Sequence, residues 1–175
     1  QIRRFPIGAR VASYWTLGEQ AVALGPTHLG RVLAHEAAAS PGEGPFARQF
    51  ATALQQRRLF LIERGWLGEN EQILQPSTLG KMADRELRSL AQRLSRELGR
   101  PVSVQTHGQV NGVYARRVDL AQGRVALILQ DQTAVVVPWR APLERFAGRR
   151  VEGLMRGQTI SWQLERSLGI PLPPM

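Results

Sequence analysis

Arginine beside an aromatic side chain is the pattern in this sequence that could do chemistry. It occurs four times from residue 114 onward: Tyr114 with Arg116 and Arg117, Trp139 with Arg140, Phe146 with Arg149 and Arg150, and Trp162 with Arg166. The planar guanidinium group binds phosphate through paired hydrogen bonds, and aromatic rings stack on nucleobases. The pattern therefore indicates a surface that binds a polyanion, of which nucleic acid is the commonest.

Seven residues are the candidate nucleic-acid contacts, and six of them are arginines: Tyr114, Arg116, Arg117, Arg124, Arg140, Arg149 and Arg150. Arginines are the stronger candidates, because a small β barrel also needs large aromatic side chains to fill its interior. Trp139 and Trp162 are accordingly expected to pack in the core, whereas Tyr114 is left open between core and surface. The contacts are expected to go to phosphates rather than to base edges.

The overall charge agrees with this interpretation. The chain has 23 Lys+Arg against 14 Asp+Glu, a formal net charge of +9, and Lys81 is its one lysine. A chain this basic attracts polyanions. The alternative explanation is a GC-rich genome in which arginine codons replace lysine codons, so that much of the excess is solvated surface.

Catalytic and metal-binding patterns are missing from the sequence. The three histidines are His28, His35 and His107, and the heptad spacing of the first two lacks a suitable third ligand. No HExxH, GxxxxGK[ST] or GxSxG motif occurs, and there is no cysteine. We therefore expect this chain to be no enzyme and to hold no cofactor and no metal.

Length and composition indicate a folded chain in a reducing compartment. The 175 residues are the size of one domain or two small ones, and a hydrophobic content of 43% is enough for a core. The lack of cysteine fits the cytoplasm, and no apolar run approaches the roughly 20 residues that a membrane span needs. Because the first residue is Gln rather than Met, we expect a piece of a longer polypeptide.

Local patterns predict a helical middle region. Residues 1–26 are expected to be a strand-like leading segment that ends a preceding domain. Residues 27–100 are expected to form a helical, winged-helix-like domain, with helices after Thr27, over 46–64 and over 77–98. Between the last two helices, residues 66–76 are expected to form a short hairpin.

After residue 100 the hydrophobic period changes from helical to strand-like. Five strands are expected, with a short helix over 141–148 between the third and the fourth: 108–120, 123–130, 133–139, 149–157 and 158–166. This order predicts a five-stranded OB-like β barrel over 101–170, followed by a tail at 171–175. An SH3-like barrel is the alternative, because a single helical turn can precede its last strand. The fold class expected for the whole chain is α+β.

A proline-bracketed corner joins the third strand to that helix. Pro138 ends the strand by removing a backbone donor, and Pro142 begins the helix where no donor is needed. Trp139 is expected to plug one end of the barrel and Glu144 to pair with a nearby arginine. The corner is therefore expected to be scaffold rather than site.

Several segments resemble the C-terminal region of plasmid relaxases of the mobilisation P class, a region that carries a domain of unassigned function. They are VNGVYARRVDLAQGRVALI, VVVPWRAPLERFAGRRVEGLMRG and ISWQLERSLG, and more weakly LFLIERGWL, LGKMADREL, LSRELGRPV and LGEQAVALGPTHLGRVLA. The resemblance covers about 17–169, and it rests most firmly on Gly112, Tyr114, Leu120, Gly123, Arg124, Pro138, Trp139, Glu144, Gly148 and Trp162. The sequence departs from the family pattern at Val125, Asp131-Gln132 and Glu165-Arg166.

The resemblance implies a bacterial protein of DNA transfer by plasmids or integrative elements. The parent relaxase would nick DNA by transesterification with a tyrosine and a three-histidine metal site in a separate N-terminal domain, and no residue here matches that motif. The implied function is a non-catalytic module that binds or positions DNA in the cytoplasm. The alternative is a protein-interaction module that docks the relaxase to the coupling protein, the type IV secretion channel or an accessory factor.

Overall fold

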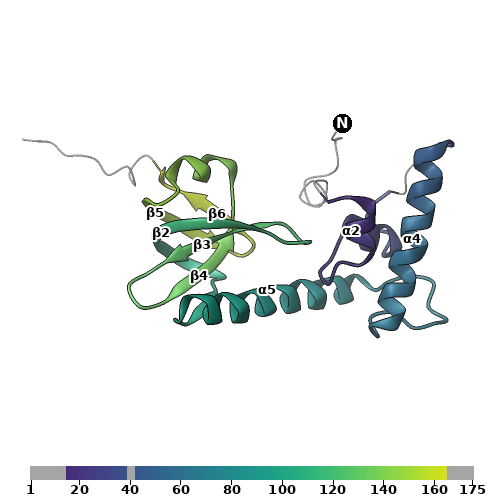
Figure 1. Cartoon of the computed structure of the whole chain (residues 1–175), viewed down its shortest axis with the longest axis horizontal. Coiled ribbons are helices and arrows are strands. Elements are labelled where there is room, and N and C mark those ends of the chain that lie inside the picture. The colour runs from purple at the N-terminus through teal and green to yellow at the C-terminus, as the bar shows by residue number, and fades with distance from the viewer. Residues whose placement is uncertain (1–14, 39–41, 165–175) are drawn as a thin grey trace, which may run out of the picture. The chain divides into compact units, whose positions relative to one another are not determined.

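The chain forms helices first and a β-sheet second, which confirms the α+β class. The computed structural model describes residues 15–38 and 42–164 (Figure 1). The chain divides into two units between Glu86 and Leu87, inside the long helix α5 (Pro76–Leu98). The boundary lies within a helix because the second half of α5 contributes Leu87, Leu90, Leu94 and Leu98 to a hydrophobic core with the sheet.

The described residues of the first unit form four helices, of which the last is the first half of α5. The others are α2 (Leu17–Ala21), α3 (His28–Leu33) and α4 (Pro45–Glu63). Thr27 caps α3 as the sequence predicted, by accepting a hydrogen bond from the backbone N–H of Gly30 at 3.1 Å. Gly65 follows α4 with a left-handed φ of 79°, which is the conformation that ends many helices.

Two strand predictions in this unit are wrong. Residues 17–21 form helix α2 rather than a strand, because Thr16 and Glu19 make a capping box that starts a helix. Residues 66–76 form no hairpin, since their backbone carbonyls at Glu71 and Gln72 accept hydrogen bonds from Arg58 of α4 instead of from a partner strand. The described residues of this unit contain no strand and therefore no wing. Residues 1–14 of the predicted strand-like leading segment lie outside the described residues.

A fully buried arginine holds the first unit together. Arg57 of α4 is 0% exposed, and its guanidinium group donates to the carbonyl oxygens of Ala23 at 2.5 Å and Gly25 at 2.7 Å. Burial lowers the pKa of Arg57 to about 10, and nearby Glu86 opposes the shift, so the group stays charged at neutral pH. The arginine thus ties the segment between α2 and α3 to α4.

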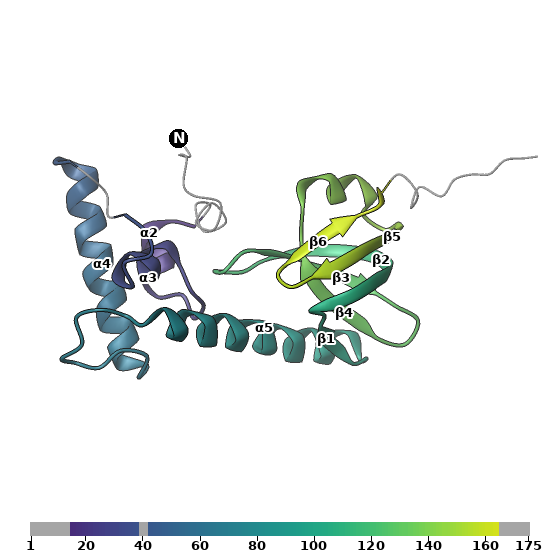
Figure 2. The ribbon, with the colours of Figure 1, turned by 180° about the vertical axis from the view of Figure 1, so that it is seen from behind.

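The second unit is a six-stranded sheet with the order β1-β4-β3-β2-β5-β6 (Figure 2). The strands are β1 (Val102–Val104), β2 (His107–Asp119), β3 (Arg124–Leu129), β4 (Ala134–Pro138), β5 (Arg150–Arg156) and β6 (Thr159–Trp162). All neighbours are antiparallel except β1 and β4. A 3₁₀ helix, η2 (Ala141–Phe146), lies where the sequence predicted a short helix.

The five-stranded barrel, OB-like or SH3-like, is not what forms. There are six strands, and the sheet remains open among the described residues. Closure would need β6 to pair with the outer edge of β4, and β1 occupies that edge in parallel. Curvature comes instead from β2, whose first half pairs with β5 and whose second half pairs with β3, with a bulge between Tyr114 and Arg116.

The sheet has a different core on each face. One face encloses Tyr114, Ile128, Val137 and Leu143 with their neighbours. The other face packs against the second half of α5 through residues such as Leu127. These two cores fix the corner and the strands that carry the candidate arginines.

Candidate nucleic-acid interface

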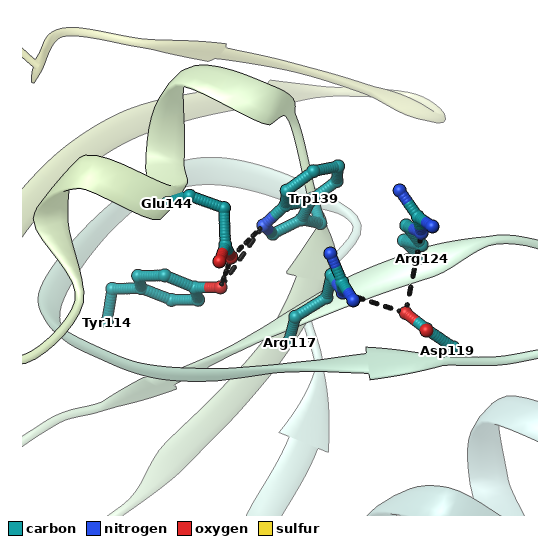
Figure 3. Close-up of polar contacts among 6 residues, drawn as sticks. All are labelled: Tyr114, Arg117, Asp119, Arg124, Trp139 and Glu144. Carbon is teal, nitrogen blue, oxygen red and sulfur yellow. Dashed lines mark hydrogen bonds and ion pairs between the residues drawn. The ribbon is translucent and has the colours of Figure 1, made fainter.

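The proline-bracketed corner is held by a network of three side chains (Figure 3). The Tyr114 hydroxyl donates a hydrogen bond to Oε1 of Glu144 at 2.5 Å. The indole N–H of Trp139 lies 2.9 Å from the same carboxylate oxygen and 3.1 Å from the Tyr114 hydroxyl oxygen. Tyr114 is 1% exposed, so it belongs to the core and cannot stack on a base.

The network also sets the protonation of its members. Burial, followed by the hydrogen bond to Glu144, raises the pKa of Tyr114 to about 12. The hydrogen bond from Tyr114 lowers the pKa of Glu144, with a smaller contribution from Trp139. Glu144 was expected to pair with an arginine, and the hydrogen bonds it forms are with these two aromatic residues.

Two of the candidate arginines, Arg117 and Arg124, pack against Trp139 of the corner. The guanidinium carbons of Arg117 and Arg124 lie 5.2 and 5.4 Å from the centre of the Trp139 ring, within cation–π range. Asp119 pairs with both, at 2.9 Å to Arg117 and 3.5 Å to Arg124. One carboxylate thus offsets half of the positive charge of this arginine pair.

Arg116 is also engaged within the second unit. Its Nη2 lies 2.8 Å from Oε2 of Glu97 on α5, and Glu97 lies 4.0 Å from Arg93 as well. This pair is about half exposed, at 51% and 48%, so it remains screened by solvent and weak. Arg116 therefore has an acidic neighbour on α5, unlike an arginine with no acidic partner, although the pair holds it only weakly.

Three other arginines converge on a groove of about 880 Å³ between η2 and β6. Arg140, Arg145 and Arg149 line it, together with Phe146 and Trp162 and with Pro142, Ile160, Ser161, Gln163 and Leu164. All three arginines are exposed, and none forms an ion pair with a residue in the described ranges. The groove is therefore the place where uncompensated positive charge gathers beside aromatic rings.

The backbones of two of the three groove arginines are fixed by hydrogen bonds of the fold. Arg140 precedes η2, and its carbonyl accepts from the N–H of Leu143 at 2.9 Å. Arg149 follows η2, and its carbonyl accepts from the N–H of Tyr114 at 3.0 Å. The backbone of Tyr114 thus holds the backbone of Arg149 in place next to the groove.

One family is found to match this chain. A family model described as "Protein of unknown function (DUF3363)" matches residues 2–171. The chain belongs to the DUF3363 family. No curated protein matches it, and no solved structure does either.

In the structure of this DUF3363 chain, the seven candidate nucleic-acid contacts lie in four different places. Arg140 and Arg149 lie in the groove; Arg117, Arg124 and Tyr114 lie at the corner; Arg116 lies beside α5. Arg150 is exposed at the start of β5, on the opposite face of the strand from the buried Val151, and does not line the groove.

Sequence reasoning missed Arg145. The signal was present, because Leu143 and Phe146 are the apolar residues of the short helix and both are buried. Because these two residues point inward, Arg145 between them must point outward, as the flanking Arg140 and Arg149 do.

Two further kinds of feature are absent from the described part of the chain. Across residues 15–38 and 42–164, no group of three or more His, Asp or Glu residues could hold a metal ion. In the same ranges, no helix of this DUF3363 chain is long and apolar enough to cross a lipid bilayer.

Proposed function

We propose that this DUF3363 chain is a non-catalytic module that binds and positions DNA for a conjugative relaxase in the bacterial cytoplasm. The observation that carries the proposal is the convergence of Arg140, Arg145 and Arg149 on one groove with no acidic partner among the described residues. Such a surface binds phosphates through charge and paired hydrogen bonds. The resemblance of the sequence to relaxase C-terminal regions supports the biological context, with DNA nicking carried out by another domain.

The groove suits the sugar-phosphate backbone better than base readout. Its charged groups are flexible arginines along one wall, and its aromatic wall is partly committed to the core. A Cβ on Gly153 would lie 2.7 Å from the Trp162 ring, so the ring packs directly against the sheet and offers at most its outer face. Binding is therefore expected to be strongly salt-dependent and weakly sequence-dependent.

The test compares matched arginine reversals. Arg140→Glu, Arg145→Glu and Arg149→Glu together should abolish binding of a fluorescein-labelled 20-nucleotide DNA at about 50 mM salt. The milder triple alanine variant should flatten the log–log salt dependence by about 2 to 3, the slope that three phosphate contacts contribute. Arg116→Glu on the α5 side is the charge-matched control for each single groove reversal, and it should cost much less affinity than Arg140→Glu, Arg145→Glu or Arg149→Glu alone. Failure of the unchanged protein to bind any DNA at that salt would rule the proposal out.

A protein-interaction function is the second candidate, and one observation favours it. Within residues 15–38 and 42–86, the first unit exposes five large hydrophobic side chains: Val22, Leu24, Phe46, Leu59 and Ile73. Exposed apolar side chains are common at docking surfaces. Capture of the coupling protein or of a secretion-channel component that survives nuclease and high salt, and is lost on Val22→Asp with Leu24→Asp, would support this function.

A further inference from the structure

The outer edge of β1 has unused backbone groups. The N–H of Ala134 donates to the carbonyl of Pro101 at 2.9 Å, and the N–H of Gln105 donates to the carbonyl of Val136 at 3.2 Å. Because alternate residues of a strand face one neighbour, Ser103 directs its N–H and C=O toward β4 and Val102 and Val104 direct theirs away. No described residue pairs with these outward groups.

A groove of about 600 Å³ runs along this edge. Its lining comes from α5 and from β1: Arg88, Ala91, Gln92, Ser95 and Arg96, with Pro101, Val102, Ser103 and Val104. The two elements lie side by side because the chain reverses at Gly99, where the Ser95 hydroxyl donates to the Arg100 carbonyl at 2.8 Å. The groove thus has hydrogen-bonding groups on one wall and arginines on the other.

The two groove arginines are not neutralised within the unit. Arg88 and Arg96 are exposed and form no ion pair with any residue in the described ranges. Arg93 on the same helix, by contrast, lies 4.0 Å from Glu97 and does not line the groove. Eight residues of helix separate Arg88 from Arg96 by about 12 Å. Carboxylates four residues apart on one face of an extended strand are about 13 Å apart and would match them.

We propose that this groove binds an extended acidic segment of another protein, which adds as a strand to the outer edge of β1. Its carboxylates, four residues apart, face Arg88 and Arg96, and its backbone pairs with Val102 and Val104. The edge offers donors and acceptors in alternation, which a peptide backbone complements and a phosphate backbone, having only acceptors, does not. This site is separate from the Arg140–Arg149 groove and does not depend on DNA binding.

The probe is a fluorescein-labelled heptapeptide, Glu-Val-Thr-Val-Glu-Val-Thr, capped at both ends, and its anisotropy is measured with the full chain. We expect saturable binding that Arg88→Glu with Arg96→Glu weakens by about tenfold or more, as two exposed ion pairs allow. Arg93→Glu, on the same helix but outside the groove, should leave the affinity within about twofold. The same peptide with Lys in place of Glu should not bind.

Backbone pairing is tested separately from charge. Val104→Pro removes an outward N–H and keeps the hydrogen bonds of β1 to β4, so it should abolish binding and leave the melting temperature nearly unchanged. Should that variant unfold, a probe N-methylated at alternate residues tests the same point on the unchanged protein and should not bind. Equal binding of the N-methylated probe, equal binding of the Lys probe, or displacement of the probe by an oligonucleotide through Arg88 and Arg96 would each overturn the proposal.

Discussion

The Tyr114 hydroxyl lies 2.5 Å from the carboxylate of Glu144, which joins the middle of β2 to η2 across thirty residues of chain. The indole N–H of Trp139 completes the contact from the end of β4. The three residues therefore fasten the corner from three elements, and backbone hydrogen bonds hold the main chain of Arg140 and Arg149 on either side of η2. This explains why a rigid corner lies between a strand and a helix: its aromatic and acidic residues position a surface that they do not themselves form.

Removal of the Tyr114 hydroxyl should destabilise the second unit without affecting DNA affinity. Tyr114→Phe keeps the buried ring and deletes a hydrogen bond to a carboxylate, which costs about 1–3 kcal/mol. Urea unfolding followed by tryptophan fluorescence measures the loss. DNA binding of the folded variant should match that of the unchanged protein, and a variant that loses affinity while keeping its stability would contradict the scaffold role.

High pH should weaken the fold through the same residue. The folded-state pKa of Tyr114 is raised to about 12, above the usual value of about 10. Its contribution is therefore fully present below about pH 10 and is lost as the pH rises from 10 to 12, because the unfolded chain ionises first. Unfolding free energies measured from pH 8 to 11.5 should fall more steeply for the unchanged protein than for Tyr114→Phe. Parallel curves would show that Tyr114 is not the group responsible.

A methyl group at Gly112 should be more disruptive than its small size suggests. A Cβ there would lie 2.3 Å from the carbonyl oxygen of Leu129 on the neighbouring strand, and backbone cannot move aside cheaply. Gly112→Ala is expected to cost about 2–3 kcal/mol by overpacking. Gly80→Ala in α5 is the matched control, because nothing lies within 4 Å of its Cβ position, and it should stabilise the helix by about 0.5–1 kcal/mol. Equal effects at the two sites would refute the packing argument.

Local signals were enough to predict most elements of this fold. Capping and turn residues such as Thr27, Gly65 and Gly99 mark helix ends through interactions within a few residues, and the structure has these helices. Helix α2 carried a readable signal too, the pairing of Thr16 with Glu19, but its apolar residues resembled a strand. Each of these correct predictions rests on an interaction between residues that are close together in the sequence.

Long-range pairing could not be predicted. β1 has three residues, and its place beside β4 depends on a contact with a segment about thirty residues later. The same holds for the arginines: Asp119 is two residues from Arg117 and could have been anticipated, whereas the partner of Arg116 is Glu97, nineteen residues earlier on a helix. Which arginines remain uncompensated, and therefore where the groove lies, follows from tertiary structure alone.

Arg57 should be indispensable to the first unit despite having no part in either proposed site. Its guanidinium group satisfies two buried carbonyls, those of Ala23 and Gly25, and lies near Glu86. Arg57→Met fills similar space but leaves those acceptors unpaired in the interior, at a cost of about 3–5 kcal/mol. Arg48→Met, at an exposed position of the same helix, is the matched control and should change stability by less than about 0.5 kcal/mol. Hydrogen exchange of the α4 backbone amides reports the difference, because protection there depends on the packing that Arg57 completes. If Arg57→Met retained the protection of the control, the buried cation would be replaceable, and the segment between α2 and α3 would be held by its hydrophobic contacts alone.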